Sequence, residues 1–133
     1  MSPRTTLLLI AACAFVSGAC GGPRDRARSC LRHGGGERLR HDAAMIYKDI
    51  FSGHGRAGFV EIPAKNWPNS FRELRPLHVG AYIDGIAIAM HATAHGETGL
   101  YVVPQSMEHT PKAMEGTRFE KIAEGIYWFS FGN

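Results

Sequence analysis

The chain has 133 residues, of which 44% are hydrophobic and 20% are charged, and its formal net charge is +3. This length favours a single domain, and this composition argues against a disordered or fibrous chain. Six arginines and two acidic residues lie between Gly21 and Arg40, so one short segment carries the basic excess and the rest is close to neutral. A broad basic surface is therefore not expected, and we predict no nucleic-acid partner.

Residues 1–19 have the three parts of a secretory signal. Arg4 supplies the positive charge, residues 7–16 form a short apolar core, and residues 17–19 are small. The apolar run is shorter than the ~20 residues that a membrane-spanning helix needs. We therefore predict that residues 1–19 are a signal peptide, which is removed and takes no part in the fold.

Cys20 follows these small residues directly and is followed by two glycines. This pattern resembles the lipobox of bacterial lipoproteins, in which the cysteine becomes the mature N-terminus and carries lipid. The resemblance implies a palmitate-type anchor at Cys20, which would hold the protein on a membrane, facing the periplasm or the exterior. Two alternatives stay open: lipidation at Cys13, which would leave a very short apolar core, and plain secretion after cleavage behind Ala19.

Residues 20–37 are rich in glycine and arginine and contain few apolar residues. Such a segment buries too little apolar surface to offset the entropy of ordering it, so we expect a flexible basic tether. Cys30 lies within it, as an unpaired thiol if Cys20 is lipidated or as a disulfide partner of Cys20 if it is not. Residues 38–133 contain no cysteine, so we expect one domain there that is stabilised by apolar burial.

Two helices are predicted. The first runs from about Arg38 to Phe51, because its apolar residues recur at helical spacing and Gly53 can cap its end. The second is short and runs from about Pro68 to Leu74, where Trp67, Phe71 and Leu74 share one helical face.

Residues 53–58 match the pattern G-x-G-x-x-G. A dinucleotide site needs a strand before this pattern and a helix after it, so that the phosphates meet a helix N-terminus. Here a helix precedes it, and a short strand is predicted to follow over Phe59 to Pro63. The pattern therefore indicates a helix end and a turn, and we predict no cofactor from it.

The centre of the chain runs from Leu77 to Thr93 and reads as two apolar strands joined at Asp84-Gly85. Asp-Gly suits a two-residue type I′ turn, in which both residues have positive φ. This turn predicts the cross-strand pairs Ile83–Ile86, Ala81–Ile88, Val79–Met90 and His78–His91. The first three pairs share one apolar face, which requires a covering layer because an isolated hairpin is only marginally stable.

Three further apolar runs complete the predicted sheet. They are Leu100 to Val103, Phe119 to Ala123 and Ile126 to Phe131, with a long surface loop from Gln105 to Thr117. The last run has apolar residues on both faces, which predicts a strand that is covered on both sides or docks a partner on one. The expected fold is α+β, with an antiparallel sheet of about five to six strands packed by one long and one short helix.

The predicted hairpin places His78 opposite His91, on the side away from the aliphatic pairs. Facing residues have Cβ atoms about 4.5–5.5 Å apart, close enough for two imidazoles to share a metal ion. His95 and Glu97 follow in the next loop, and imidazole with carboxylate suits zinc or copper. A metal site at His78, His91 and His95 is therefore one hypothesis, and otherwise we predict no cofactor.

No catalytic residue can be named from the sequence, because no serine lies in a G-x-S-x-G elbow and no pair of carboxylates is placed across a cleft. We therefore favour a small lipid-anchored or secreted bacterial envelope protein with a non-enzymatic binding or structural role. Its protein or small-molecule partner is left undefined. The alternatives are a periplasmic metal-binding protein and a small hydrolase with an unidentified site.

Overall fold

The fold is described by a computed structural model over residues 21–53, 59–112 and 115–132. Its elements in chain order are α2 (Pro23–Arg32), α3 (Gly35–Gly53), β1 (Phe59–Ile62), a short 3-10 helix η1 (Ala64–Asn66), α4 (Asn69–Arg72), β2 (His78–Tyr82), β3 (Gly85–Thr93), β4 (Gly96–Val102), β5 (Thr117–Ala123) and β6 (Ile126–Phe131). The six strands form one antiparallel sheet in the order β1-β2-β3-β4-β6-β5. This confirms the predicted α+β fold.

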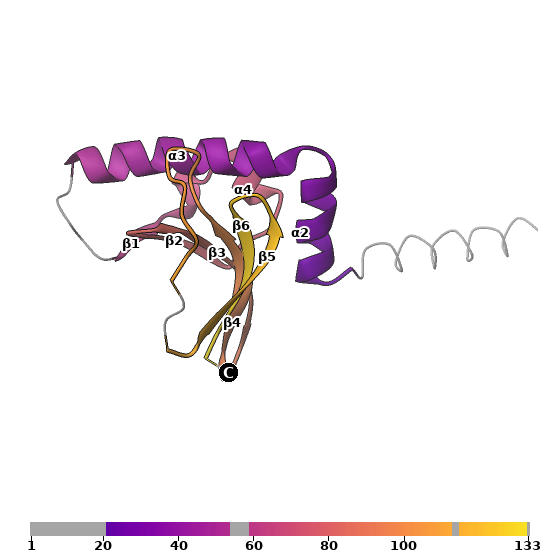
Figure 1. The fold of residues 1–133 in the computed structure, drawn as a ribbon. Coiled ribbons are helices and arrows are strands. Elements are labelled where there is room, and N and C mark those ends of the chain that lie inside the picture. The colour runs from indigo at the N-terminus through magenta and orange to yellow at the C-terminus, as the bar shows by residue number, and fades with distance from the viewer. Residues whose placement is uncertain (1–20, 54–58, 113–114, 133) are drawn as a thin grey trace, which may run out of the picture.

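Helix α3 lies across one face of the sheet, and α2 stands at its side (Figure 1). The buried residues Leu39, Ala43 and Tyr47 of α3 are four residues apart, so one stripe of the helix faces the sheet. The helix begins three residues before the predicted start at Arg38. Within the three described ranges, no helix combines the length and the apolar character that crossing a bilayer requires.

Helix α2 occupies residues where the sequence analysis expected a flexible tether. Pro23 lies in its first turn, Asp25 is near its positive N-terminal end and Arg32 is in its last turn, all of which favour a helix. Ala27 is completely buried. Arg24 forms a 2.5 Å ion pair with Glu120 on β5. The structure differs from the expected tether because Ala27 and the long side chain of Arg24 hold this helix against the sheet. A run of large apolar residues is not needed for this packing.

The predicted hairpin is present as β2 and β3, but its predicted register is wrong by two residues. Tyr82 pairs with Gly85, so the turn residues are Ile83 and Asp84, and His78 lies opposite Ala89. Among the described non-glycine residues only Arg75 has a positive φ, so the turn is not type I′. A shift of two keeps the paired residues of β2 and the first half of β3 on their predicted faces, so Val79, Ala81 and Ile88 stay in the core. Ile83 is the exception in this half of the hairpin, because it becomes an exposed turn residue.

The central strands of the sheet are buried on both faces. The face toward the helices holds the main cluster, which includes Ile86, Ile88, Leu100 and Ile126. A second cluster on the other face contains Ala89, Tyr101, Val103, Tyr127 and Phe129. Met107, from the connection after β4, packs against both clusters, and His109 Nε2 lies 2.7 Å from the carbonyl oxygen of Asp84. Strand β6 is therefore covered on both sides, one of the two arrangements that its sequence predicted.

Candidate functional site: an arginine-lined pocket

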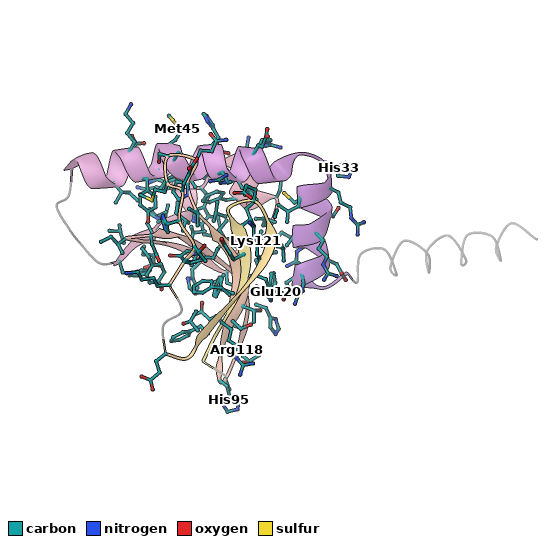
Figure 2. The ribbon with its side chains drawn as sticks, in the orientation of Figure 1. His33, Met45, His95, Arg118, Glu120 and Lys121 are labelled. Carbon is teal, nitrogen blue, oxygen red and sulfur yellow. The ribbon has the colours of Figure 1, made fainter. Side chains whose placement is uncertain are left out.

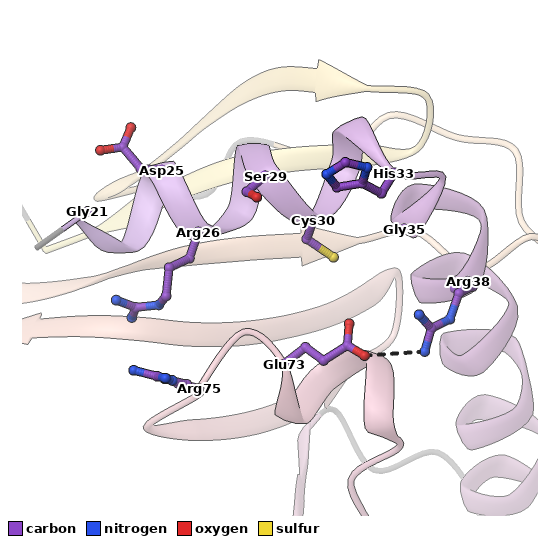
Figure 3. Close-up of a pocket in the computed structure, with 10 residues that line it drawn as sticks. All are labelled: Gly21, Asp25, Arg26, Ser29, Cys30, His33, Gly35, Arg38, Glu73 and Arg75. Atoms are coloured by element: carbon purple, nitrogen blue, oxygen red, sulfur yellow. Dashed lines mark ion pairs between the residues drawn. The ribbon is translucent and has the colours of Figure 1, made fainter. Parts of the chain in front are cut away.

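A pocket of about 640 Å³ lies where α2, the start of α3 and the connection from α4 to β2 meet. Most of the residues that line it are charged or polar, and they come from parts of the sequence that are far apart (Figure 3). The charged residues that line it are Asp25, Arg26, Arg38, Glu73 and Arg75, so arginines outnumber carboxylates. This excess of positive charge makes the pocket a candidate site for an anion.

Each arginine is held by a different element. Arg26 lies next to the fully buried Ala27 on α2. Because the burial of Ala27 sets how the helix packs, it also sets the direction in which the side chain of Arg26 points. Arg38 lies near the start of α3. Arg75 follows α4 and has φ +53°, a left-handed conformation that costs a non-glycine residue about 1–2 kcal/mol. Backbone strain of this kind clusters at functional sites, and here it lies on the pocket wall.

The three arginines differ in their partners. Nη2 of Arg38 lies 3.7 Å from Oε1 of Glu73. The side chains of Arg26 and Arg75 form no hydrogen bond or ion pair with any residue that the structure describes, and Nε of Arg26 is buried without an acceptor. Figure 3 shows both of these guanidinium groups on one side of the pocket, away from Glu73. A bound anion would supply an acceptor to the buried Nε of Arg26, and the exposed Arg75 is free to contact the same anion.

Cys30 also lines this pocket, and its thiol is free. Burial raises the pKa of the thiol above its ordinary value, the negative charge of Glu73 raises it further, and the nearby Arg38 acts in the opposite direction. The thiol therefore stays protonated at neutral pH. Since the thiolate is the reactive form, the chemistry of the pocket favours binding over nucleophilic attack.

The three histidines predicted as metal ligands lie in different places. Nε2 of His78 is 2.7 Å from Oε2 of Glu97. His95 lies in the β3–β4 turn, at the end of the sheet far from the helices (Figure 2). Within the described ranges, no group of three or more His, Cys, Asp and Glu residues is placed to hold a metal ion. A zinc or copper site at these residues stays a prediction.

The predicted pairing of His78 with His91 is wrong, and a β-bulge explains why the two separate. The register of β3 against β4 shifts between Ala89 and His91, so that His91 lies opposite Thr98. Thr98 is two residues from Leu100, which faces the helices, whereas His78 pairs with Ala89 in the cluster on the other face. The extra residue of the bulge therefore turns His91 to the opposite side of the sheet from His78.

Several predicted features lie outside the described residues. These are the signal peptide over residues 1–19, the candidate lipidation sites Cys13 and Cys20, and residues 54–58 of the G-x-G-x-x-G pattern. The pocket residues Arg26 and Arg75 were not predicted from the sequence, because Arg26 was placed in the tether and the second helix was ended at Leu74, just before Arg75. The density of arginine between Gly21 and Arg40 was the one available signal, and it does not show which arginines converge.

Comparisons with models of known protein families, with curated proteins and with solved structures found no match.

Proposed function

We propose that this protein is a small binding protein of the bacterial cell envelope that takes an anionic ligand into the arginine-lined pocket. The observation that carries the proposal is the pair Arg26 and Arg75, which line one cavity and lack an acceptor among the described residues. The envelope location rests on the sequence of residues 1–20, with a lipid anchor at Cys20 or plain secretion as its two forms.

Electrostatics favours this assignment. Two guanidinium groups that share a pocket repel each other, and a buried N–H without an acceptor carries a desolvation cost. A carboxylate or phosphate would relieve both effects, because its oxygens accept the paired N–H groups of arginine in a bidentate geometry. Hydrogen bonds to charged groups contribute about 1.5–3 kcal/mol each, so two arginines are enough for measurable affinity.

Arg38 and Glu73 add a means of adjusting to the ligand. Their 3.7 Å separation exceeds that of a hydrogen-bonded ion pair, and both side chains are about half exposed. A pair of this kind contributes only about 0–1 kcal/mol. Arg38 can therefore turn from Glu73 toward a bound anion at little cost in free energy.

The test is a titration of the purified full chain with inorganic phosphate, followed by calorimetry and by NMR chemical shifts. The variant Arg26→Gln/Arg75→Gln keeps polar side chains but removes both charges, and we expect its affinity to fall by on the order of tenfold or more. Arg118→Gln is the matched control, because Arg118 is an exposed arginine near the far end of the sheet (Figure 2). Equal affinities in all three proteins would refute the proposal.

A further inference from the structure

We infer that the outer face of α2 docks on an anionic phospholipid surface and that the anion received by the pocket is the phosphate of a lipid headgroup. This inference rests on the proposed function and names the source of the ligand. Three observations lead to it: the distribution of charge around α2, the position of Gly21 in the pocket wall, and the lack of protein partners for the outer arginines.

Helix α2 presents three different surfaces. Ala27 is completely buried, and Leu31 packs against the main core from one turn further along the helix. Arg28 and Arg32 are exposed and lie one turn apart, so they share the face that points away from the protein. The exposed Asp25 lies one turn before Arg28, and the two arginines leave this face with a net positive charge. Arg26 lies on the flank and lines the pocket. One helix thus joins a basic outer face directly to the unpaired arginine of the pocket.

The outer arginines are not used within the protein. Arg24 differs from them, since it forms an ion pair with Glu120 and its guanidinium carbon lies 5.7 Å from the ring centroid of Trp128. The side chains of Arg28 and Arg32 form no ion pair or hydrogen bond with any residue in the described ranges. Their charges are therefore available to an external partner of opposite sign.

The position of Gly21 indicates which partner covers this surface. Gly21 lines the pocket, and it directly follows Cys20, the predicted lipidation site. Consecutive Cα atoms are only about 3.8 Å apart. A lipid attached to Cys20 would therefore place the mouth of the pocket at the bilayer surface, where phosphate groups are the most abundant anions.

Binding energetics agree with this arrangement. Each Lys or Arg close to an anionic bilayer contributes about 1 kcal/mol, and lipid anchors are often reinforced by a basic patch. Arg28 and Arg32 would supply that general attraction, while Arg26 and Arg75 would bind one phosphate specifically. The two pairs of arginines thus have separable roles, and this separation makes the inference testable.

The experiment uses the full chain with Cys13→Ser and Cys20→Ser, so that no lipid can be attached. Binding is measured by co-sedimentation with vesicles of phosphatidylcholine alone and of phosphatidylcholine mixed with phosphatidylglycerol. Residues 1–19, including the positive Arg4, are the same in every variant, so differences between variants on the anionic vesicles isolate the contribution of the arginines that are replaced. Arg118→Gln again serves as the control for the loss of an exposed positive charge.

We expect Arg28→Gln/Arg32→Gln to lower the affinity for the anionic vesicles by on the order of tenfold while leaving phosphate binding unchanged. Arg26→Gln/Arg75→Gln should weaken both. Equal binding to the two kinds of vesicle, with phosphate binding intact, would overturn the inference and leave the proposed function standing, with a free anion as the ligand. Phosphate binding that is insensitive to Arg26 and Arg75 would overturn both.

Discussion

Replacing Gly85 by alanine tests how tightly the second face of the sheet is packed. A Cβ atom at this position would lie 2.8 Å from Cζ of Tyr101 and 3.0 Å from its Cδ1. The ring cannot easily retreat, because its hydroxyl donates a hydrogen bond to the carboxylate of Asp84 and its centroid lies 5.0 Å from that of Phe119. Gly85→Ala must therefore displace either the ring or the backbone of β3.

The expected cost follows from two opposing effects. Inserting a methyl group into a well-packed site costs about 1–3 kcal/mol, whereas alanine is favoured over glycine within a strand by roughly 0.5–1 kcal/mol. Gly85 does not have a positive φ, so its backbone adds no strain for alanine. We expect Gly85→Ala to lower the free energy of unfolding by about 1–2 kcal/mol.

Urea denaturation followed by far-ultraviolet circular dichroism measures this change. Gly21→Ala is the control, because a Cβ there would meet only Cβ of Asp25, at an ordinary contact distance of 3.6 Å, and its effect should stay within about 0.5 kcal/mol. In a Tyr101→Ala background the cost of Gly85→Ala should disappear, since the ring that causes it is gone. A neutral Gly85→Ala, or an equal cost in both backgrounds, would refute the packing argument.

Two further predictions concern pH and the anchor. Burial raises the pKa of Tyr47 and of Tyr101 above the ordinary value of a tyrosine, so both keep their protons when folded and lose them when unfolded. The unfolded state therefore binds fewer protons above about pH 10, and stability should fall as the pH rises past that point; a constant urea midpoint up to about pH 11 would contradict this. Cys20→Ala should release the protein from membranes, as fractionation can show, whereas release by Cys13→Ala alone would move the anchor to Cys13.

The alternation of apolar residues along the chain determined the strands and their faces. The hairpin over β2 and β3 shows how much of the structure this alternation predicts. Its paired aliphatic residues lie on the predicted face, although Tyr82 pairs with Gly85. Ile83 is the exception, because it lies in the turn with Asp84 and is exposed. A register shift of two residues leaves the faces unchanged, so the apolar pattern cannot detect it. Asp84-Gly85 suggested a type I′ turn, but the space needed by the Tyr101 ring explains Gly85 better.

The bulge between Ala89 and His91 shows where the sequence pattern stops being informative. No glycine or proline within β3 marks it, because the extra residue is Met90, an ordinary strand residue that is buried in the core. The pairing with β4 produces the bulge, and β4 is a separate segment of the chain. The relation between His78 and His91 was therefore decided by tertiary structure.

Helix α2 and the pocket beside it depend on contacts over long distances in the sequence. Residues 21–37 contain few apolar residues, which gave no reason to expect a docked helix. The ion pair of Arg24 with Glu120 forms only when β5 is folded beside the helix. Gly35 permits the corner between α2 and α3, because a Cβ there would overlap the carbonyl oxygen of Cys30. Gly35 lines the same pocket as Arg26 and Arg75.

The sequence by itself therefore determined the fold class, most of the strands and the faces of the sheet, because these follow from a periodicity that neighbouring residues carry. Tertiary structure alone determined which charged side chains line the same pocket. Arg26 and Arg75 have nothing in their local sequences to link them, and their shared pocket exists because α2, α3 and the connection after α4 are packed against one sheet.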